Sequence, residues 1–220
     1  GRIATASGES QWISAPEGRR WALGEREHHD AILIGRGTAV TDDPRLDRRL
    51  GRALGPNLRV VLDRQLRIGP DARLFTVDGP ICLYAEQPDG DDAATDAWRA
   101  RRDALVARGA EVVVLVHVTP KTVLADLHTR GVQSVLVEGG GEVHGAFLAA
   151  GAFDRVAVDC APRLIGGAGA PGPIGDPGFA RLDDAPRLDS PRLLRRGGDV
   201  IMEAFHERCL PDLYASVDGS

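Results

Sequence analysis

The chain has 220 residues, of which 43% are hydrophobic and 27% charged, and its formal net charge is −5. This composition is typical of a globular protein with a sizeable core, and the acidic balance argues against a nucleic-acid or membrane-surface partner. No apolar run approaches the roughly 18 residues of a membrane-spanning helix and no signal peptide is recognisable, so we expect a cytoplasmic protein.

The cysteines point to a reducing compartment. Cys82, Cys160 and Cys209 are far apart, and the first two lie in apolar strand-like runs, where we expect buried thiols. No group of His and Cys has zinc spacing, so we expect no metal. The chain begins at Gly1 rather than Met, and we expect that upstream residues have been lost.

The first elements in chain order are a polar segment and a helix. Residues 1–14 are polar, rich in small residues and carry one large aromatic, Trp12, which is either a packing anchor or a plate for a planar ligand. Ser14-Ala-Pro-Glu17 has the pattern of a capping box with proline in the first turn, and it predicts a helix from about Ala15 to His28.

Strands and helices then alternate. The apolar runs predict strands at Ala31–Gly35, Leu58–Asp63, Pro80–Ala85, Glu111–Val116, Ser134–Val137, Arg155–Cys160 and Val200–Phe205. Further helices are predicted at Asp96–Ala107, from Thr119 to Gly131, and at Gly141–Ala150. The alternation indicates an α/β fold with a largely parallel sheet, which should end antiparallel because Gly197-Gly198 separates two strand-like runs. Leu46–Asn57 and Leu164–Ser190 are predicted loops, and the tail after Cys209 should fray.

Two glycine turns are candidate phosphate sites. The strand ending at Val137 runs into Glu138 and Gly139-Gly-Gly141, and the strand ending at Gly35 runs into Arg-Gly-Thr38. Such turns present bare backbone N–H groups and the positive end of a helix. The alternative is a plain strand-to-helix turn with a solvated glutamate. If both turns bind, they suit a ligand with two phosphorylated ends.

A Rossmann dinucleotide motif is the obvious rival interpretation. That motif needs G-x-G-x-x-G after the first strand, but the frame starting at Gly139 places His144 where the third glycine belongs. The unit also lies late in the chain. We therefore reject this motif.

Taken together, the motifs resemble the pyrimidine reductase domain of riboflavin biosynthesis over residues 1–208. The resemblance rests on Ser7-Gly-Glu-Ser-Gln-Trp-Ile-Ser14, Gly37-Thr38 with Asp42-Asp43-Pro44, Val137-Glu-Gly-Gly140 and Ala161-Pro-Arg-Leu-Ile-Gly-Gly167. It implies a dihydrofolate-reductase-like three-layer fold with a mostly parallel central sheet and an antiparallel C-terminal hairpin. It also implies that the family's first strand is missing before Gly1, that residues 209–220 are a tail, and that the protein is a homodimer.

The resemblance further implies the activity. This would be an NADPH-dependent oxidoreductase that reduces the ribosyl group of a phosphoribosylamino-pyrimidine to ribityl, by hydride attack on C1′ of an open, imine-like sugar. A zinc deaminase is often fused upstream in this family. This chain has no His-x-Glu or Pro-Cys-x-x-Cys, so it cannot itself deaminate.

The resemblance assigns site residues by position. Glu138 would be catalytic and would contact the substrate. The other substrate contacts would be Ser10, Arg26, Leu46 and Arg49. Cofactor contacts would be Trp12, Thr38, Asp42, Gly140, Gly141, Glu142, Val143, His144, Gly145 and Ala146. Arg36 and Arg64 depart from the family pattern. Either arginine could reach the 2′-phosphate of NADPH, and the alternative is that both side chains are solvated.

Two other functions stay open. A related NADPH reductase could act on a pterin or another heterocycle, although Ser10, Arg49 and Glu138 favour the phosphoribosyl substrate. The missing first strand also allows a non-catalytic nucleotide-binding module. NADPH binding without turnover would favour that third function.

Overall fold

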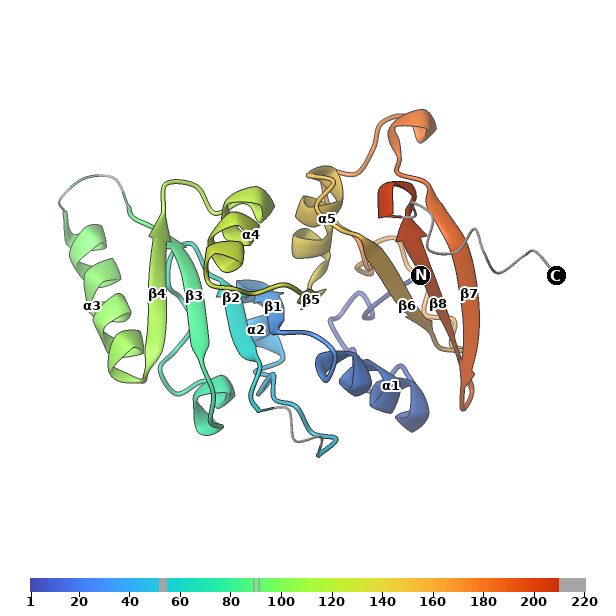
Figure 1. The fold of residues 1–220 in the computed structure, drawn as a ribbon, viewed down its shortest axis with the longest axis horizontal. Coiled ribbons are helices and arrows are strands. Elements are labelled where there is room, and N and C mark those ends of the chain that lie inside the picture. Colours follow the sequence, from blue (N-terminus) through green and yellow to red (C-terminus); the bar gives the residue numbers. More distant parts are fainter. Residues whose placement is uncertain (52–54, 89, 91, 210–220) are drawn as a thin grey trace.

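Two separate sheets organise the molecule (Figure 1). The structure is a computed structural model that describes residues 1–51, 55–88, 90 and 92–209. The predicted C-terminal tail therefore lies outside the described residues, apart from Cys209. So do residues 52–54 of the predicted loop at Leu46–Asn57. Within the described ranges, no helix is both long enough and apolar enough to cross a membrane.

The larger sheet is five-stranded and parallel. Its strands are β1 (Ala31–Gly35), β2 (Leu58–Leu62), β3 (Ile81–Glu86), β4 (Ala110–Leu115) and β5 (Val135–Gly139), in the order β4-β3-β2-β1-β5. The connections from β1 to β4 all step toward one edge, and β5 then pairs with the other side of β1. The strand order therefore reverses between β1 and β5, which is where open α/β sheets bind ligands.

Helices cover both faces of this sheet. They are α2 (Arg36–Thr41), α3 (Ala93–Ala107), α4 (Pro120–Thr129) and α5 (Gly141–Ala149). Alternate residues of β1 enter two core clusters: Ile32 and Ile34 lie with residues of α2 and α3, and Leu33 lies with residues of α4 and α5. All five residues of β1 are buried, as expected for the interior strand of a three-layer fold.

The smaller sheet is antiparallel, with the order β6-β8-β7, and the described residues show no pairing between it and the larger sheet. Its strands are β6 (Arg155–Cys160), β7 (Leu188–Arg196) and β8 (Asp199–His206). The hairpin at Gly197-Gly198 is confirmed, but the expectation that it extends the parallel sheet is wrong. Strand periodicity identifies a strand without identifying its neighbour.

The first helix, α1 (Pro16–Arg26), contacts β7 and β8 of the smaller sheet. The predicted capping box is wrong, because no side chain of the local sequence caps this helix. Instead the backbone N–H of Ala15 donates to Asp199 Oδ2 over 2.7 Å, across the chain from β8. The carboxylate of Asp199, distant in the sequence, thus accepts a hydrogen bond at the start of α1, where the predicted capping box would have used Ser14 and Glu17.

Other boundaries also differ from the prediction. The turn after β1 continues as the short helix α2, α3 begins at Ala93 with Asp92 as its N-cap, and β7 begins inside the predicted loop. Short 3-10 helices lie at Arg73–Thr76, Leu182–Asp184 and Glu207–Cys209. Cys82 is buried as expected, but Cys160 is exposed because it lies near the end of β6, an edge strand.

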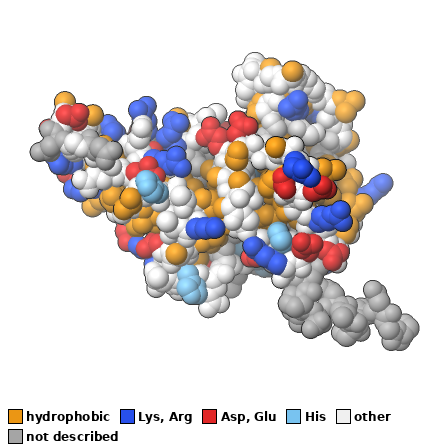
Figure 2. All heavy atoms as spheres, turned by 90° about the horizontal axis from the view of Figure 1, so that it is seen from above, with side chains coloured by type: hydrophobic (Ala, Val, Ile, Leu, Met, Phe, Trp, Pro, Cys, Tyr) orange, Lys and Arg blue, Asp and Glu red, His pale blue; other side chains and the backbone are white. Residues whose placement is uncertain are grey.

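The surface shows no region of a single charge on the face seen in Figure 2. Basic and acidic side chains are interspersed there. This mixed surface agrees with the modest net charge of −5.

Candidate active site

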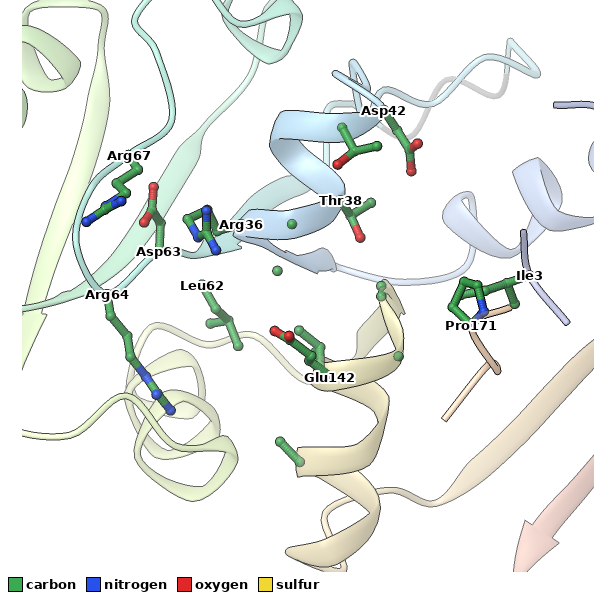
Figure 3. A pocket seen from close by; sticks show the side chains of 18 of the residues that line it. Ile3, Arg36, Thr38, Asp42, Leu62, Asp63, Arg64, Arg67, Glu142 and Pro171 are labelled. Atoms are coloured by element: carbon green, nitrogen blue, oxygen red, sulfur yellow. The ribbon is translucent and has the colours of Figure 1, made fainter. Parts of the chain in front are cut away.

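A cavity of about 1020 Å³ lies at the carboxyl edge of β1, β2 and β5 (Figure 3). Its lining comes from the two glycine turns, from the residues that follow β2, from the start of α4, and from the N-terminal segment of the chain. The cavity therefore spans the point at which the strand order reverses. It is large enough for a dinucleotide-sized ligand.

The two glycine turns form the middle of the cavity. Gly35 and Gly37 come from the turn between β1 and α2, and Gly139 to Gly141 come from the turn between β5 and α5. Gly140 has a φ of +81°, and a Cβ on it would lie 2.9 Å from Thr38 Oγ1. Among the described residues no side chain caps the N-terminus of α5, so its first N–H groups can bind a ligand. These features fit the phosphates of a nucleotide cofactor.

Arginines gather at one end of the cavity. Arg36, Arg64 and Arg67 all line it, and Figure 3 shows them around the ends of β1 and β2. The side chain of Arg64 is 65% exposed, with Nη2 donating to the carbonyl oxygen of Val118 over 3.2 Å and Nε 3.5 Å from Glu86. This end of the cavity is therefore rich in positive charge and suits a further phosphate.

Asp42, the C-cap residue of α2, lines the cavity (Figure 3). Burial raises its pKa above the ordinary value for aspartate. A carboxyl group with a raised pKa in a ligand-sized cavity is a frequent feature of active sites.

The opposite end of the cavity is formed by the N-terminal segment. Ile3, Ala4, Gly8 and Ser10 line it together with Pro171. The backbone N–H of Ile3 donates to the carbonyl oxygen of Pro171 over 3.0 Å, which ties this segment to the long loop before β7.

Glu138 and Arg26 form a bidentate ion pair. Nε and Nη2 of Arg26 each donate to one carboxylate oxygen over 2.6 Å. Their side chains are only 23% and 11% exposed. The carboxylate of Glu138 is therefore held in a fixed orientation by the planar guanidinium.

The structure brings eight of the predicted site residues together in the cavity lining. They are Ser10, Thr38, Asp42, Gly140, Gly141, Glu142, Val143 and Ala146. Glu138 and Arg26 pair with each other outside that lining.

The remaining predicted residues lie elsewhere. Leu46 is 1% exposed and belongs to the hydrophobic core beside β1, and Arg49 pairs with Asp47 at the surface. Trp12 lines a separate cavity of about 340 Å³, with the Arg19 guanidinium 4.5 Å from its ring centroid. His144 and Gly145 contact the loop at residues 173–176.

Several lining residues were missed by the sequence analysis. Asp63, Gln65 and Arg67 follow β2, Val118 and Thr119 precede α4, and Pro120 is the first residue of α4. Their position directly after parallel strands is a signal that could have identified them, because ligands bind at that edge. Pro171 has no such signal, since only tertiary folding brings it to the cavity.

The comparisons with known proteins agree with this architecture. The family description "RibD C-terminal domain" matches residues 1–202. The chain is 36% identical to riboflavin biosynthesis protein RibD of Bacillus amyloliquefaciens, over 93% of this chain and 54% of that protein. It is 33% identical to the 2,5-diamino-6-ribosylamino-4(3H)-pyrimidinone 5′-phosphate reductase of Methanothermobacter thermautotrophicus, over 92% of this chain and 91% of that protein.

A solved structure supports the fold. Acinetobacter baumannii RibD aligns with a TM-score of 0.74 and 23% identity, covering 94% of this chain and 54% of that one. The chain thus spans about half the length of RibD and nearly all of the archaeal reductase. The expected fold class is confirmed, and the chain belongs to the RibD C-terminal domain family.

Proposed function

We propose that this chain is an NADPH-dependent reductase that converts the ribosyl group of a phosphoribosylamino-pyrimidine to ribityl in riboflavin biosynthesis. The observation that carries the proposal is the cavity at the strand-order reversal, with uncapped α5 and two glycine turns in its middle. The archaeal relative supports the substrate class, since nearly its whole length is matched and it is named a pyrimidinone 5′-phosphate reductase.

The lining suggests how a cofactor would lie. The N-terminus of α5 and the turn at Gly35–Thr38 would hold the pyrophosphate through backbone N–H groups. Leu62, Val118 and Pro120 would form the apolar wall for the adenine, with Arg36, Arg64 and Arg67 within reach of a 2′-phosphate. The nicotinamide would then point toward Ser10 and Pro171.

The chemistry would be supplied by the cofactor, which when bound donates a hydride to C1′ of the open-chain sugar. The protein's part is positioning: Ser10 would orient the substrate at the end of the cavity where the nicotinamide lies. Glu138, which is paired with Arg26 and directly precedes Gly139 of the cavity lining, would accept hydrogen bonds from the pyrimidine through the remaining lone pairs of its carboxylate. The exocyclic nitrogen takes a proton as C1′ takes the hydride. Asp42 is a cavity carboxyl group whose pKa is raised by burial, and a proton relay through it is part of the proposal.

The test is oxidation of NADPH, followed by absorbance, with each of the two phosphoribosylamino-pyrimidines: the aminouracil and the diaminopyrimidinone. We expect turnover with one of them, and that substrate fixes whether reduction follows or precedes deamination. Absence of oxidation with either, in protein that still binds NADPH, would contradict the proposed substrate and favour another heterocycle.

A substitution at Glu138 tests its role. We expect Glu138→Gln to reduce turnover about 100-fold while NADPH affinity changes little, because the charge facing Arg26 is lost and the substrate is misplaced. Glu111→Gln is the matched control, since Glu111 pairs with Arg130 at the surface on β4. Unchanged turnover in Glu138→Gln would remove this residue from the chemistry.

Assembly is part of the same proposal. We infer a cytoplasmic homodimer and an upstream fused deaminase domain. The fused arrangement is supported by a Thermotoga maritima protein of this fold, whose name joins a deaminase to a 5-amino-6-(5-phosphoribosylamino)uracil reductase.

A further inference from the structure

His144 lies on α5 with both ring nitrogens facing carbonyl oxygens. Nδ1 is 2.9 Å from the carbonyl oxygen of Pro173, and Nε2 is 3.2 Å from the carbonyl oxygen of Val137 on β5. A neutral imidazole has one N–H, so it can donate to only one of these oxygens and turns a lone pair toward the other. An imidazolium donates to both. The charge state of His144 therefore decides whether one or two hydrogen bonds join β5, α5 and the loop.

The loop at residues 172–176 lies directly on the N-terminal half of α5. The backbone N–H of Gly175 donates to the carbonyl oxygen of Gly141 over 2.8 Å. A Cβ on Gly141 would lie 3.1 Å from the carbonyl oxygen of Gly172, and one on Gly145 would collide with the carbonyl oxygen of Asp176. Glycine thus permits a backbone-to-backbone contact with little side-chain packing to hold it. Polar contacts such as those of His144 must supply that hold.

This contact joins the two halves of the cavity. On one side, Gly141, Glu142 and Val143 of α5 line the cavity. On the other side, Pro171 also lines it and accepts the hydrogen bond of Ile3, while Ala170 accepts a hydrogen bond from Arg2 over 2.6 Å. Movement of the loop away from α5 would displace the N-terminal segment together with it.

Three carboxylates lie on β5, on α5 and on the loop at residues 172–176, the elements that His144 contacts. Glu138, next to Val137 on β5, is engaged by Arg26. Glu142 lies two residues away on α5, and Asp176 lies on the loop. Among the described residues no carboxylate forms an ion pair with the ring, whose polar partners are the two carbonyl oxygens. The positive end of α5 opposes a charge on the ring, whereas the carbonyl oxygens favour it.

We propose that His144 is a positioning residue whose imidazolium form latches the loop at residues 172–176 onto α5 and so holds the cofactor cavity closed on that side. The contact between His144 and the loop does not depend on the proposed function. Its expected consequence does: cofactor affinity should fall as His144 loses its proton. A bound dinucleotide would in turn favour the imidazolium, since its phosphates would lie at the N-terminus of α5.

The first experiment measures the latch without cofactor. Amide hydrogen exchange is compared at Gly175 in wild type, His144→Gln, His144→Leu and the control His128→Gln, whose side chain is exposed on α4. We expect protection at Gly175 to fall about tenfold in both His144 variants and to stay unchanged in the control. Unchanged protection at Gly175 in both variants would overturn the proposal.

The second experiment measures NADPH binding by fluorescence, at about pH 6 and about pH 8. We expect wild type and His128→Gln to lose about fivefold more affinity over this range than His144→Gln. The cofactor's own phosphate also titrates in this pH range, but its effect on affinity is the same for all variants and cancels in the comparison. Equal pH dependence in wild type and His144→Gln would overturn the latch. Loss of Gly175 protection without NADPH binding at either pH would support the latch and contradict the proposed function.

Discussion

The two glycine turns at the carboxyl edge of the larger sheet look alike in sequence but differ in structure. In the turn after β5, Gly140 has a φ of +81° and Gly139 lies against Ile34, so a Cβ would strain the backbone at Gly140 and crowd Ile34 at Gly139. In the turn after β1, Gly37 has ordinary helical backbone, and a Cβ there would meet no atom within 4 Å. The protein itself requires glycine at Gly140 but not at Gly37. An open glycine in a cavity lining is explained if a ligand occupies the space beside it.

The largest effect is expected from Gly140→Ala. The substitution places a side chain in a backbone region that is nearly exclusive to glycine, at a cost of about 1–3 kcal/mol. It also displaces Thr38, whose Oγ1 would lie 2.9 Å from the new methyl group. Urea denaturation and NADPH titration should show lost stability and lost binding together. Normal binding in a destabilised protein would separate this turn from the cofactor site.

Gly37→Ala is the matched variant in the other turn. We expect stability to stay the same or to rise by about 0.5–1 kcal/mol, because alanine suits a helix better than glycine. NADPH affinity should fall about tenfold, because the methyl group occupies cavity space beside the phosphates. The same two measurements check this result. Unimpaired NADPH binding would mean that the turn after β1 does not contact the cofactor.

A smaller effect is expected from the arginines beside the turn after β1. Arg64→Ala and Arg36→Ala should each weaken NADPH binding about threefold to tenfold and leave NADH binding unchanged, because only NADPH carries the 2′-phosphate. Arg102→Ala is the control, since Arg102 pairs with Asp103 on α3. Equal losses for both cofactors would rule out the contact with the 2′-phosphate, and no loss for either would mean that these arginines are solvated side chains.

The smallest effect is expected far from both turns, at Asp159 on β6. Burial raises its pKa, and the neighbouring charge of Asp199 adds to the rise. A raised pKa means that folding favours the protonated form, so this group's contribution to stability declines as pH rises above 3.8, the ordinary value for aspartate. Asp159→Asn should therefore raise the Tm by about 1–3 °C at neutral pH and change it little below about pH 4. Thermal melts at both pH values check this. An equal shift at both would rule out ionisation as the cause.

Much of the larger sheet could be predicted from residue patterns. Its five strands are short apolar runs bounded by turn residues, and the helices between them carry local signals such as Thr119-Pro120 before α4. The six-residue α2 was missed because it is too short to show helical periodicity. The separate smaller sheet was missed because pairing partners are chosen by packing rather than by local pattern.

The candidate site divides in the same way. Residues near the glycine turns, such as Thr38 and Val143, line the cavity as their place after a strand implied. Leu46 lies in the core instead, and Arg26 contacts Glu138 of β5 from the end of α1. A resemblance predicts which positions matter, whereas these contacts depend on how residues 46–51 and α1 lie against the sheet.

The sequence by itself determined the order of strands and helices, the two glycine turns and the family. Each of these can be predicted from the types and the local spacing of the residues. The tertiary structure alone decided that Asp199 caps α1, that Glu138 is held by Arg26, and that His144 joins α5 to the loop around Pro173. These contacts link residues from 29 to 184 positions apart along the chain. Such pairs form only when the burial of apolar faces has brought their elements together.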